Sequence, residues 1–309
     1  MKKLTEYPFV VTARNFFNRI SLPGFQGVPI GKVMSFFVKA LSKGIIFHRA
    51  AAMTYRIFIA LIPLLMALFS AISFLGEDVR ATILSFIQSM VPEYVWPAVS
   101  NMITEVVNNQ NGTLLSFSFL FGTVFFVISV NASINILNTN YYRSKRRTFI
   151  KQLGVIIGMT FTWLIIVLLA VGVFIAASAG FSYLDTHYFR SPQLLHTAVS
   201  IAKWLLLWFL VYLFISSFYY IAPADRKNYS FFSAGSSFAA IAMVLVLGAL
   251  NFYFANFGNY NVLYGSLGAI FAILLWLYWN AMFILVGFDL NVSIAAAKKF
   301  THHQNPDKK

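Results

Sequence analysis

The sequence contains no cysteine and few charged residues. Of 309 residues, 10% are Asp, Glu, Lys or Arg, and only nine of these are acidic. The lack of cysteine excludes disulfide bonds, zinc–thiolate sites, iron–sulfur clusters and a cysteine nucleophile. An ordinary soluble domain carries about 25% charged residues. A content of 59% hydrophobic residues therefore favours one membrane-embedded bundle over the two soluble domains that this length would allow.

Catalytic motifs are also missing. The sequence has no HEXXH zinc motif, no G-x-S-x-G nucleophile elbow and no P-loop. Hydrolysis of a phosphodiester needs metal-binding carboxylates or an acid–base pair. The acids on the predicted cytoplasmic side are far apart in sequence, namely Glu6, Asp225, Asp289 and Asp307. We therefore expect no enzyme activity, no catalytic residue, no cofactor and no metal.

What the sequence does have is six long apolar runs. A membrane-spanning helix needs about 20 predominantly apolar residues. Continuous apolarity favours helices, since the strands of a membrane barrel alternate in hydrophobicity. The sequence therefore predicts an all-α, polytopic membrane protein with six transmembrane helices, at residues 50–74, 114–136, 153–179, 202–221, 232–254 and 262–294.

The loops between these runs alternate in charge, and the formal net charge is +14. Cytoplasmic loops of membrane proteins carry an excess of Lys and Arg. This rule predicts that both termini are cytoplasmic. It also explains the basic charge without nucleic acid, which we do not expect as a partner. The predicted cytoplasmic segments hold Arg49, Arg143, Lys145, Arg146, Arg147, Lys151, Arg226, Lys227, Lys298 and Lys299.

We divide the chain into a polar N-terminal segment (1–27) with no signal-peptide pattern, a single transmembrane domain (28–298) and a cytoplasmic tail (299–309). Residues 32–47 form a predicted amphipathic cytoplasmic helix, with Lys32, Lys39 and Lys43 on one stripe. This helix either lies on the inner leaflet, with its lysines toward anionic lipid headgroups, or packs on the end of the bundle. Residues 77–112 predict two short amphipathic helices on the outer face.

Polar residues inside the spans are the informative ones, because in lipid each must find a partner or line water. Arg56 in the first span either reaches the headgroups or binds an anion in a cytoplasmic vestibule. Pro63 kinks the same span. Asn131, Asn135 and Asn138 share one face of the second span. That face either joins helices or borders a hydrated cavity, and we expect it to point toward the first or sixth span.

The last two spans hold the densest pattern. Asn256, Asn259 and Tyr264 crowd the short external link, and Gly265 and Gly268 allow close helix packing or contact with a ligand. Asp289 is the only acid within any predicted span. It is either a proton or cation site, or a structural partner of a cytoplasmic cation, with Arg56 the leading candidate.

These motifs resemble the YihY/BrkB family of bacterial inner-membrane proteins over residues 30–298. The resemblance rests on the stretches 50–55, 62–63, 131–141 and 220–223, and above all on 254–278. Arg56 departs from the family pattern, which more often has an uncharged residue there. The resemblance implies six spans and a transport or envelope-maintenance role, although members have carried the labels ribonuclease BN and serum-resistance factor.

Three functions fit this sequence. The first is a transporter or lipid-handling protein of unknown substrate, supported by the polar faces and the kinked first span. The second is a scaffold that binds partners without transport, supported by the lack of a charged site at mid-membrane depth. The third is a membrane-bound ribonuclease, which rests on basic charge that topology already explains.

Overall fold

The computed structural model describes residues 24–43, 45–91, 96–140, 143–144, 147–187, 193–225, 229–257 and 266–304. Apart from a two-residue antiparallel pair, the regular elements in these ranges are helices. In chain order they are α2 (Ile30–Lys43), α3 (Ile46–Ile72), α4 (Glu77–Met90), α5 (Trp96–Asn108), α6 (Gly112–Asn138), β1 (Thr139–Asn140), β2 (Arg143–Ser144), α7 (Phe149–His187), α8 (Gln193–Ile221), α9 (Ala234–Phe257) and α11 (Ser266–Gln304).

Five helical stretches in the described residues are long and apolar enough to cross a membrane: Ile46–Ile72, Gly112–Asn138, Phe149–Ala170, Ala234–Phe254 and Ile270–Phe300. The remaining predicted span falls on α8, whose apolar stretch Trp208–Ile221 is shorter. The all-helical membrane fold is thus confirmed, with five of the six predicted spans meeting this test.

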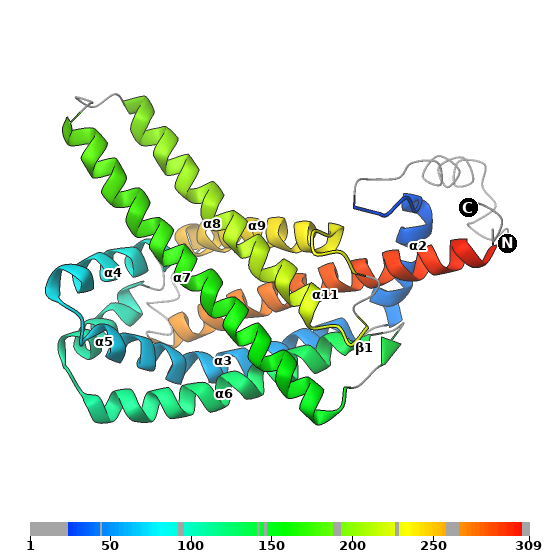
Figure 1. The fold of residues 1–309 in the computed structure, drawn as a ribbon, viewed down its shortest axis with the longest axis horizontal. Helices are drawn as coiled ribbons and strands as arrows, with labels where there is room; N and C mark the ends of the chain where they lie inside the picture. Colours follow the sequence, from blue (N-terminus) through cyan, green and yellow to red (C-terminus); the bar gives the residue numbers. More distant parts are fainter. Residues whose placement is uncertain are drawn as a thin grey trace.

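The long helices form a bundle crossed by a hairpin. Helices α3, α6, α9 and α11 run along the long axis, whereas α7 and α8 form an antiparallel pair that crosses the bundle obliquely and projects from it where the two helices are joined (Figure 1). We call the end where α3 begins and α11 ends the basic end. The short helices α4 and α5 cover the opposite end (Figure 1).

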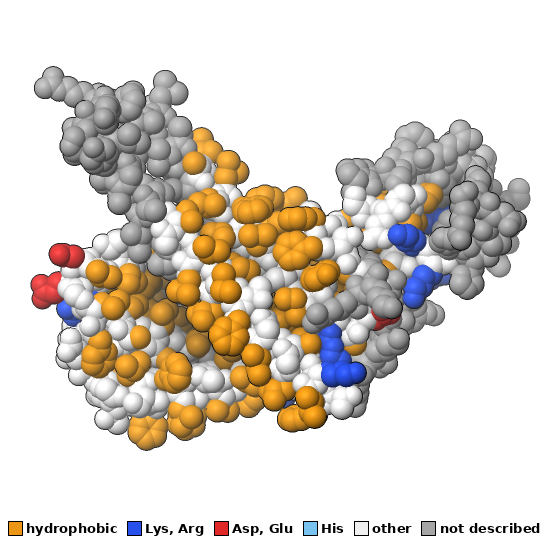
Figure 2. All heavy atoms as spheres, viewed as in Figure 1, with side chains coloured by type: hydrophobic (Ala, Val, Ile, Leu, Met, Phe, Trp, Pro, Cys, Tyr) orange, Lys and Arg blue, Asp and Glu red, His pale blue; other side chains and the backbone are white. Residues whose placement is uncertain are grey.

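The two ends of the bundle differ in the charge of their side chains. The first turn of α4 carries Glu77 and Asp78, which suit the positive pole of a helix N-terminus. Lysine and arginine side chains gather at the basic end, and apolar side chains cover the surface between (Figure 2). Large apolar side chains on the outer faces of α6 and α7 are more than 40% exposed, among them Phe119, Leu120, Phe161 and Leu168. An apolar surface of this extent is typical of a bundle that contacts lipid.

Small residues bring α3 and α6 together. Ser118, Gly122, Ser129 and Ser133 on α6 are buried. A Cβ atom at Gly122 would lie 3.3 Å from the Pro63 carbonyl oxygen of α3, so only a small residue fits there. Small residues at intervals of four allow close helix approach in membranes. The predicted kink residue Pro63 therefore lies inside α3 at this contact.

The helices expected outside the spans are present. Helix α2 packs on α11, with Val33 only 1% exposed and in one apolar cluster with Ile294 and Ala297. This contact fits the packed alternative of the two that the sequence left open. At the other end, α4 and α5 pack on α3 through a cluster that includes Ile87, Ile103 and Phe69.

Candidate functional site

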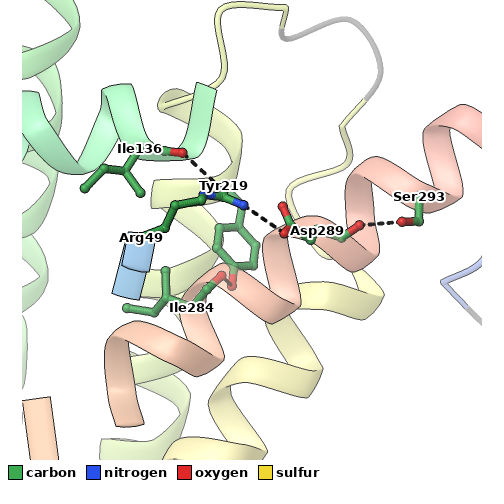
Figure 3. Close-up of polar contacts among 6 residues, drawn as sticks. All are labelled: Arg49, Ile136, Tyr219, Ile284, Asp289 and Ser293. Carbon is green, nitrogen blue, oxygen red and sulfur yellow. Dashed lines mark hydrogen bonds and ion pairs between the residues drawn. The ribbon is translucent and has the colours of Figure 1, made fainter. Parts of the chain in front are cut away.

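The site is a buried ion pair at the basic end. Arg49, in the first turn of α3, approaches Asp289 of α11 with 3.0 Å between Nη1 and Oδ2. The two side chains are only 10% and 3% exposed. Arg49 Nη2 also donates a hydrogen bond of 3.1 Å to the Ile136 carbonyl in the last turn of α6. One guanidinium thus joins three helices (Figure 3).

The predicted partner of Asp289, Arg56, was wrong, although the partner is a cation as expected. The cation is Arg49, seven residues before Arg56. Arg56 is exposed, and no hydrogen bond or ion pair links it to the described part of the chain. The error was one of depth, since α3 begins at Ile46, whereas the predicted span began at residue 50 and placed Arg49 outside it. Arg49, seven residues before Arg56, lies on the same stripe of the helix. This spacing could have identified Arg49 as an alternative partner of Asp289.

The surroundings of the pair are largely apolar and aromatic. Tyr219 of α8 is fully buried, and its hydroxyl donates to the Ile284 carbonyl at 2.6 Å (Figure 3). Its ring lies 5.6 Å from that of Phe288, the neighbour of Asp289. The Ser293 hydroxyl donates to the Asp289 backbone carbonyl at 2.7 Å. A fourth helix, α8, therefore packs beside the pair through Tyr219.

Two polar atoms of the pair lack a partner among the described residues. Arg49 Nε and Asp289 Oδ1 are buried and make no hydrogen bond within the described residues. A buried polar atom left without a partner costs about 1–3 kcal/mol. The pair therefore retains one free donor and one free acceptor, which a water molecule, a proton on the carboxylate or a small ligand could satisfy.

The chemical capacity of this arrangement is narrow. A carboxylate accepts hydrogen bonds or a proton, and a guanidinium donates hydrogen bonds and keeps its charge. No group of three His, Cys, Asp or Glu residues that could hold a metal ion occurs in the described ranges. The pair can therefore bind an anion through Arg49, exchange a proton at Asp289, or clamp the helices.

The asparagine face of α6 points away from α3. Asn131 Oδ1 accepts hydrogen bonds from Gln152 of α7 at 3.0 Å and from Asn135 at 3.4 Å. Asn138 donates to the Ala222 carbonyl at 3.1 Å and accepts from the Ala224 amide at 2.8 Å. The expected direction, toward the first or sixth span, is therefore wrong. The partners are α7 and the chain that follows α8, and these contacts fit the helix-joining interpretation.

Arg147, which the sequence analysis treated only as a topological charge, binds the end of α8. Its guanidinium donates to the carbonyls of Ala222 at 2.8 Å and Ile221 at 3.2 Å, and also to that of Pro223. The last carbonyls of a helix lack intrahelical partners and carry partial negative charge. Arg147 and Asn138 together satisfy them. The sequence feature that could have indicated this role is a basic residue in the connection that follows an asparagine-rich helix end.

Helices α9 and α11 touch at the level of their backbones. A Cβ atom at Gly235 or Gly287 would lie closer than 3.0 Å to the carbonyl oxygen of the other glycine. Asn291, two residues beyond Asp289, accepts from the Gly235 amide and donates to the Ser233 hydroxyl, both at 2.8 Å. This crossing was not predicted, because the sequence analysis placed close packing at the opposite end of α11.

The remaining predicted residues lie at that opposite end. Gly268 is buried in the first turn of α11. Asn256 falls within α9, but its side chain lies outside the described residues, as do Asn259, Tyr264 and Gly265 altogether. The site around Asp289 therefore contains one of the predicted residues and joins it to Arg49, Tyr219 and Asn291.

Comparison with known proteins gives a family. The family model described as virulence factor BrkB matches residues 37–309. The ribonuclease-like protein YfkH of Bacillus subtilis is 26% identical over 262 residues, which cover 84% of this chain and 93% of that protein. A UPF0761 membrane protein of Mannheimia succiniciproducens is 29% identical over 252 residues, covering 78% of this chain and 82% of the relative. No solved structure matches the chain.

The match spans every helix of the bundle from within α2 onward, including both residues of the buried pair. It bears out the resemblance seen in the sequence motifs. The chain belongs to the virulence factor BrkB family of membrane proteins.

Proposed function

We propose that this protein is a six-span inner-membrane protein that transports a substrate or handles lipid, with both termini in the cytoplasm. Helix α8 has 29 residues and would supply the sixth span, since its length of about 43 Å exceeds the roughly 30 Å hydrocarbon layer. The orientation rests on the positive-inside rule, because the basic end would face the cytoplasm. The long helices then cross the layer in alternating directions.

The Arg49–Asp289 pair carries the functional part of this proposal. Ionisable residues within membrane helices are costly, and they typically mark substrate pathways, ion pathways or proton relays. This pair lies where α3, α6 and α11 meet, and two of its polar atoms have no protein partner in the described residues. A pair that served packing alone would be expected to satisfy both atoms. The free donor and acceptor favour a group that exchanges partners during a working cycle.

A non-transporting scaffold is the second candidate. The observation that favours it is the low exposure of the pair, 10% and 3%, together with the bond from Arg49 to Ile136. A buried clamp with these contacts would hold three helices in one arrangement for a partner to bind. A ribonuclease role, suggested only by the printed name of the Bacillus relative, gains no support from a single carboxylate that already binds a guanidinium.

Reconstitution separates these candidates. Purified protein would be placed in liposomes that contain a fluorescent phospholipid, and dithionite would measure how much label moves between the leaflets. We expect movement above that of empty liposomes, and its loss in Asp289→Asn. Asp78→Asn on α4 is the matched control, because it makes the same carboxylate-to-amide change at an exposed site.

A second arm covers substrates other than lipid. The same variants would be tested for complementation of a deletion strain, with the amount of protein in the membrane fraction measured in parallel. A transport or lipid-handling role predicts that Asp289→Asn loses more complementation than its fall in protein level explains. Loss of protein and of complementation in the same proportion would support the scaffold instead. Full activity of Asp289→Asn in both arms would rule out a working role for the pair.

A further inference from the structure

A second arginine of α3 lies on the outside of the bundle. Arg56 is exposed, and it stands seven residues after Arg49, on the same stripe of the helix. It is ten residues from Ile46, the start of α3, which corresponds to about 15 Å along the axis. A permanent positive charge therefore lies well inside a helix that is apolar and long enough to cross a membrane.

The depth of Arg56 follows from the contacts of Arg49. Arg49 bonds the carbonyl of Ile136, two residues before α6 ends at Asn138. Helix α6 has 27 residues and is about 40 Å long, so a hydrocarbon layer of about 30 Å centred on it would begin close to Ile136. Arg56 lies seven residues farther along α3, or about 10 Å deeper. Its backbone is therefore inside the hydrocarbon layer.

The charge of Arg56 has no counter-charge in the described protein. The single acid of α11 is already bound by Arg49, and no ion pair or hydrogen bond of Arg56 occurs among the described residues. The neighbouring surface of α3 is apolar: Tyr55 is 60% exposed, Ala52 is exposed and Ile59 is partly exposed. An unpaired cation in such surroundings draws headgroups or water into the layer, or bends its side chain toward the interface.

We propose that Arg56 binds the phosphate of a membrane lipid headgroup, whose acyl chains cover the exposed apolar face of α3. Guanidinium matches phosphate through paired hydrogen bonds. A lipid fits better than free phosphate, because the exposed surface beside Arg56 is apolar and would be left uncovered by a small hydrated anion. Because Arg49 lies on the same stripe, the headgroup would sit beside the buried pair. The inference names a ligand class for the proposed function, but lipid binding itself does not require transport.

Native mass spectrometry of the delipidated protein tests this inference. The probes are phosphatidylglycerol, a diacylglycerol with the same chains, and inorganic phosphate. We expect Arg56→Gln to bind phosphatidylglycerol about tenfold more weakly, the loss expected for one charge-assisted contact. Arg56→Lys should bind with an affinity between those of the wild type and Arg56→Gln, since lysine keeps the charge but cannot make the paired hydrogen bonds. Lys151→Gln, a change at an exposed lysine of α7, is the matched control.

The inference is overturned by any of three results: equal binding by Arg56→Gln and the wild type, equal binding of diacylglycerol and phosphatidylglycerol, or tight binding of inorganic phosphate that displaces the lipid. If Arg56→Gln does not fold, Arg56→Lys and the two lipid probes still decide between these outcomes. Failure of lipid transfer in liposomes with intact binding would instead count against the proposed function alone.

Discussion

Removing one charge of the buried pair should destabilise the bundle strongly. In Asp289→Asn the side chain keeps its shape and one acceptor oxygen, but the Arg49 charge loses its counter-ion. Arg49 then has only neutral acceptors, the new amide oxygen and the Ile136 carbonyl, and it is 10% exposed, so water cannot replace the carboxylate without opening the helix contact. Breaking a buried ion pair by removing one partner typically costs 3–5 kcal/mol. We expect about 3 kcal/mol here, because the amide oxygen still accepts a hydrogen bond.

A double-mutant cycle tests the origin of that loss. Arg49→Met together with Asp289→Asn removes both charges, and replacing both members of a buried pair is often close to neutral. The double variant should therefore recover most of the stability that either single variant loses. The charge swap Arg49→Asp with Asp289→Arg should recover part of it. Stability would be measured by SDS titration of the protein in mixed micelles, followed by circular dichroism.

Arg56→Met supplies the internal control for this cycle. Its side chain is exposed and makes no ion pair among the described residues, so it should not couple to Asp289. Sites without a shared partner usually give additive effects within about 0.5 kcal/mol. The reasoning is refuted if Asp289→Asn changes the free energy of unfolding by less than about 1 kcal/mol, or if Asp289 couples to Arg56 as strongly as to Arg49.

Three further predictions concern the topology and the helix contacts. Reporter fusions after Lys151, Lys227 and Lys299 should report cytoplasm, and fusions at Gly112 and Ser191 should report the outside; a cytoplasmic signal at Gly112 would contradict the proposed orientation. Gly287→Leu should prevent α9 and α11 from packing together, as judged by gel filtration, because its Cβ meets the Gly235 backbone. A Cβ at Gly248 would have nothing within 4 Å, so Gly248→Ala should unfold no more easily than the wild type. Arg147→Gln should lower stability by about 1–3 kcal/mol, since it leaves carbonyls at the end of α8 unsatisfied, while Lys151→Gln, an exposed lysine of α7, should change SDS-induced unfolding little.

The long helices could be predicted from the sequence because each apolar run is visible in the local sequence. Each apolar run falls on a long helix, and the two short helices between residues 77 and 112 are present. The orientation inferred from loop charge stays a prediction, although lysine and arginine side chains gather at one end of the bundle (Figure 2). These features depend on local sequence and on the solvent, and neither requires knowledge of which helices touch.

The candidate site was predicted only in part, because partner choice depends on helix pairing. Asp289 stood out as an acid in an apolar helix. Its partner is Arg49, which lies about two helical turns before the predicted Arg56 in α3. The asparagine face was correctly placed on one side of α6, yet its neighbours are α7 and the chain after α8. Periodicity gives the face of a helix and leaves open which helix covers it.

The polar contacts that join helices are concentrated at the basic end. Arg49 ties α3 to α6 and α11, Arg147 and Asn138 bind the end of α8, and Asn291 ties α11 to the start of α9. At the opposite end α3, α4 and α5 meet mainly through an apolar cluster that includes Phe69 and Ile103, with two polar contacts, from Arg80 to the Val107 carbonyl and from Gln110 to the Ser73 carbonyl. Directional bonds resist sliding and rotation more than apolar contacts do, since only one geometry satisfies them. A bundle built this way would move by pivoting about its basic end, where release of Arg49 from Asp289 would loosen α11 from α3 and α6.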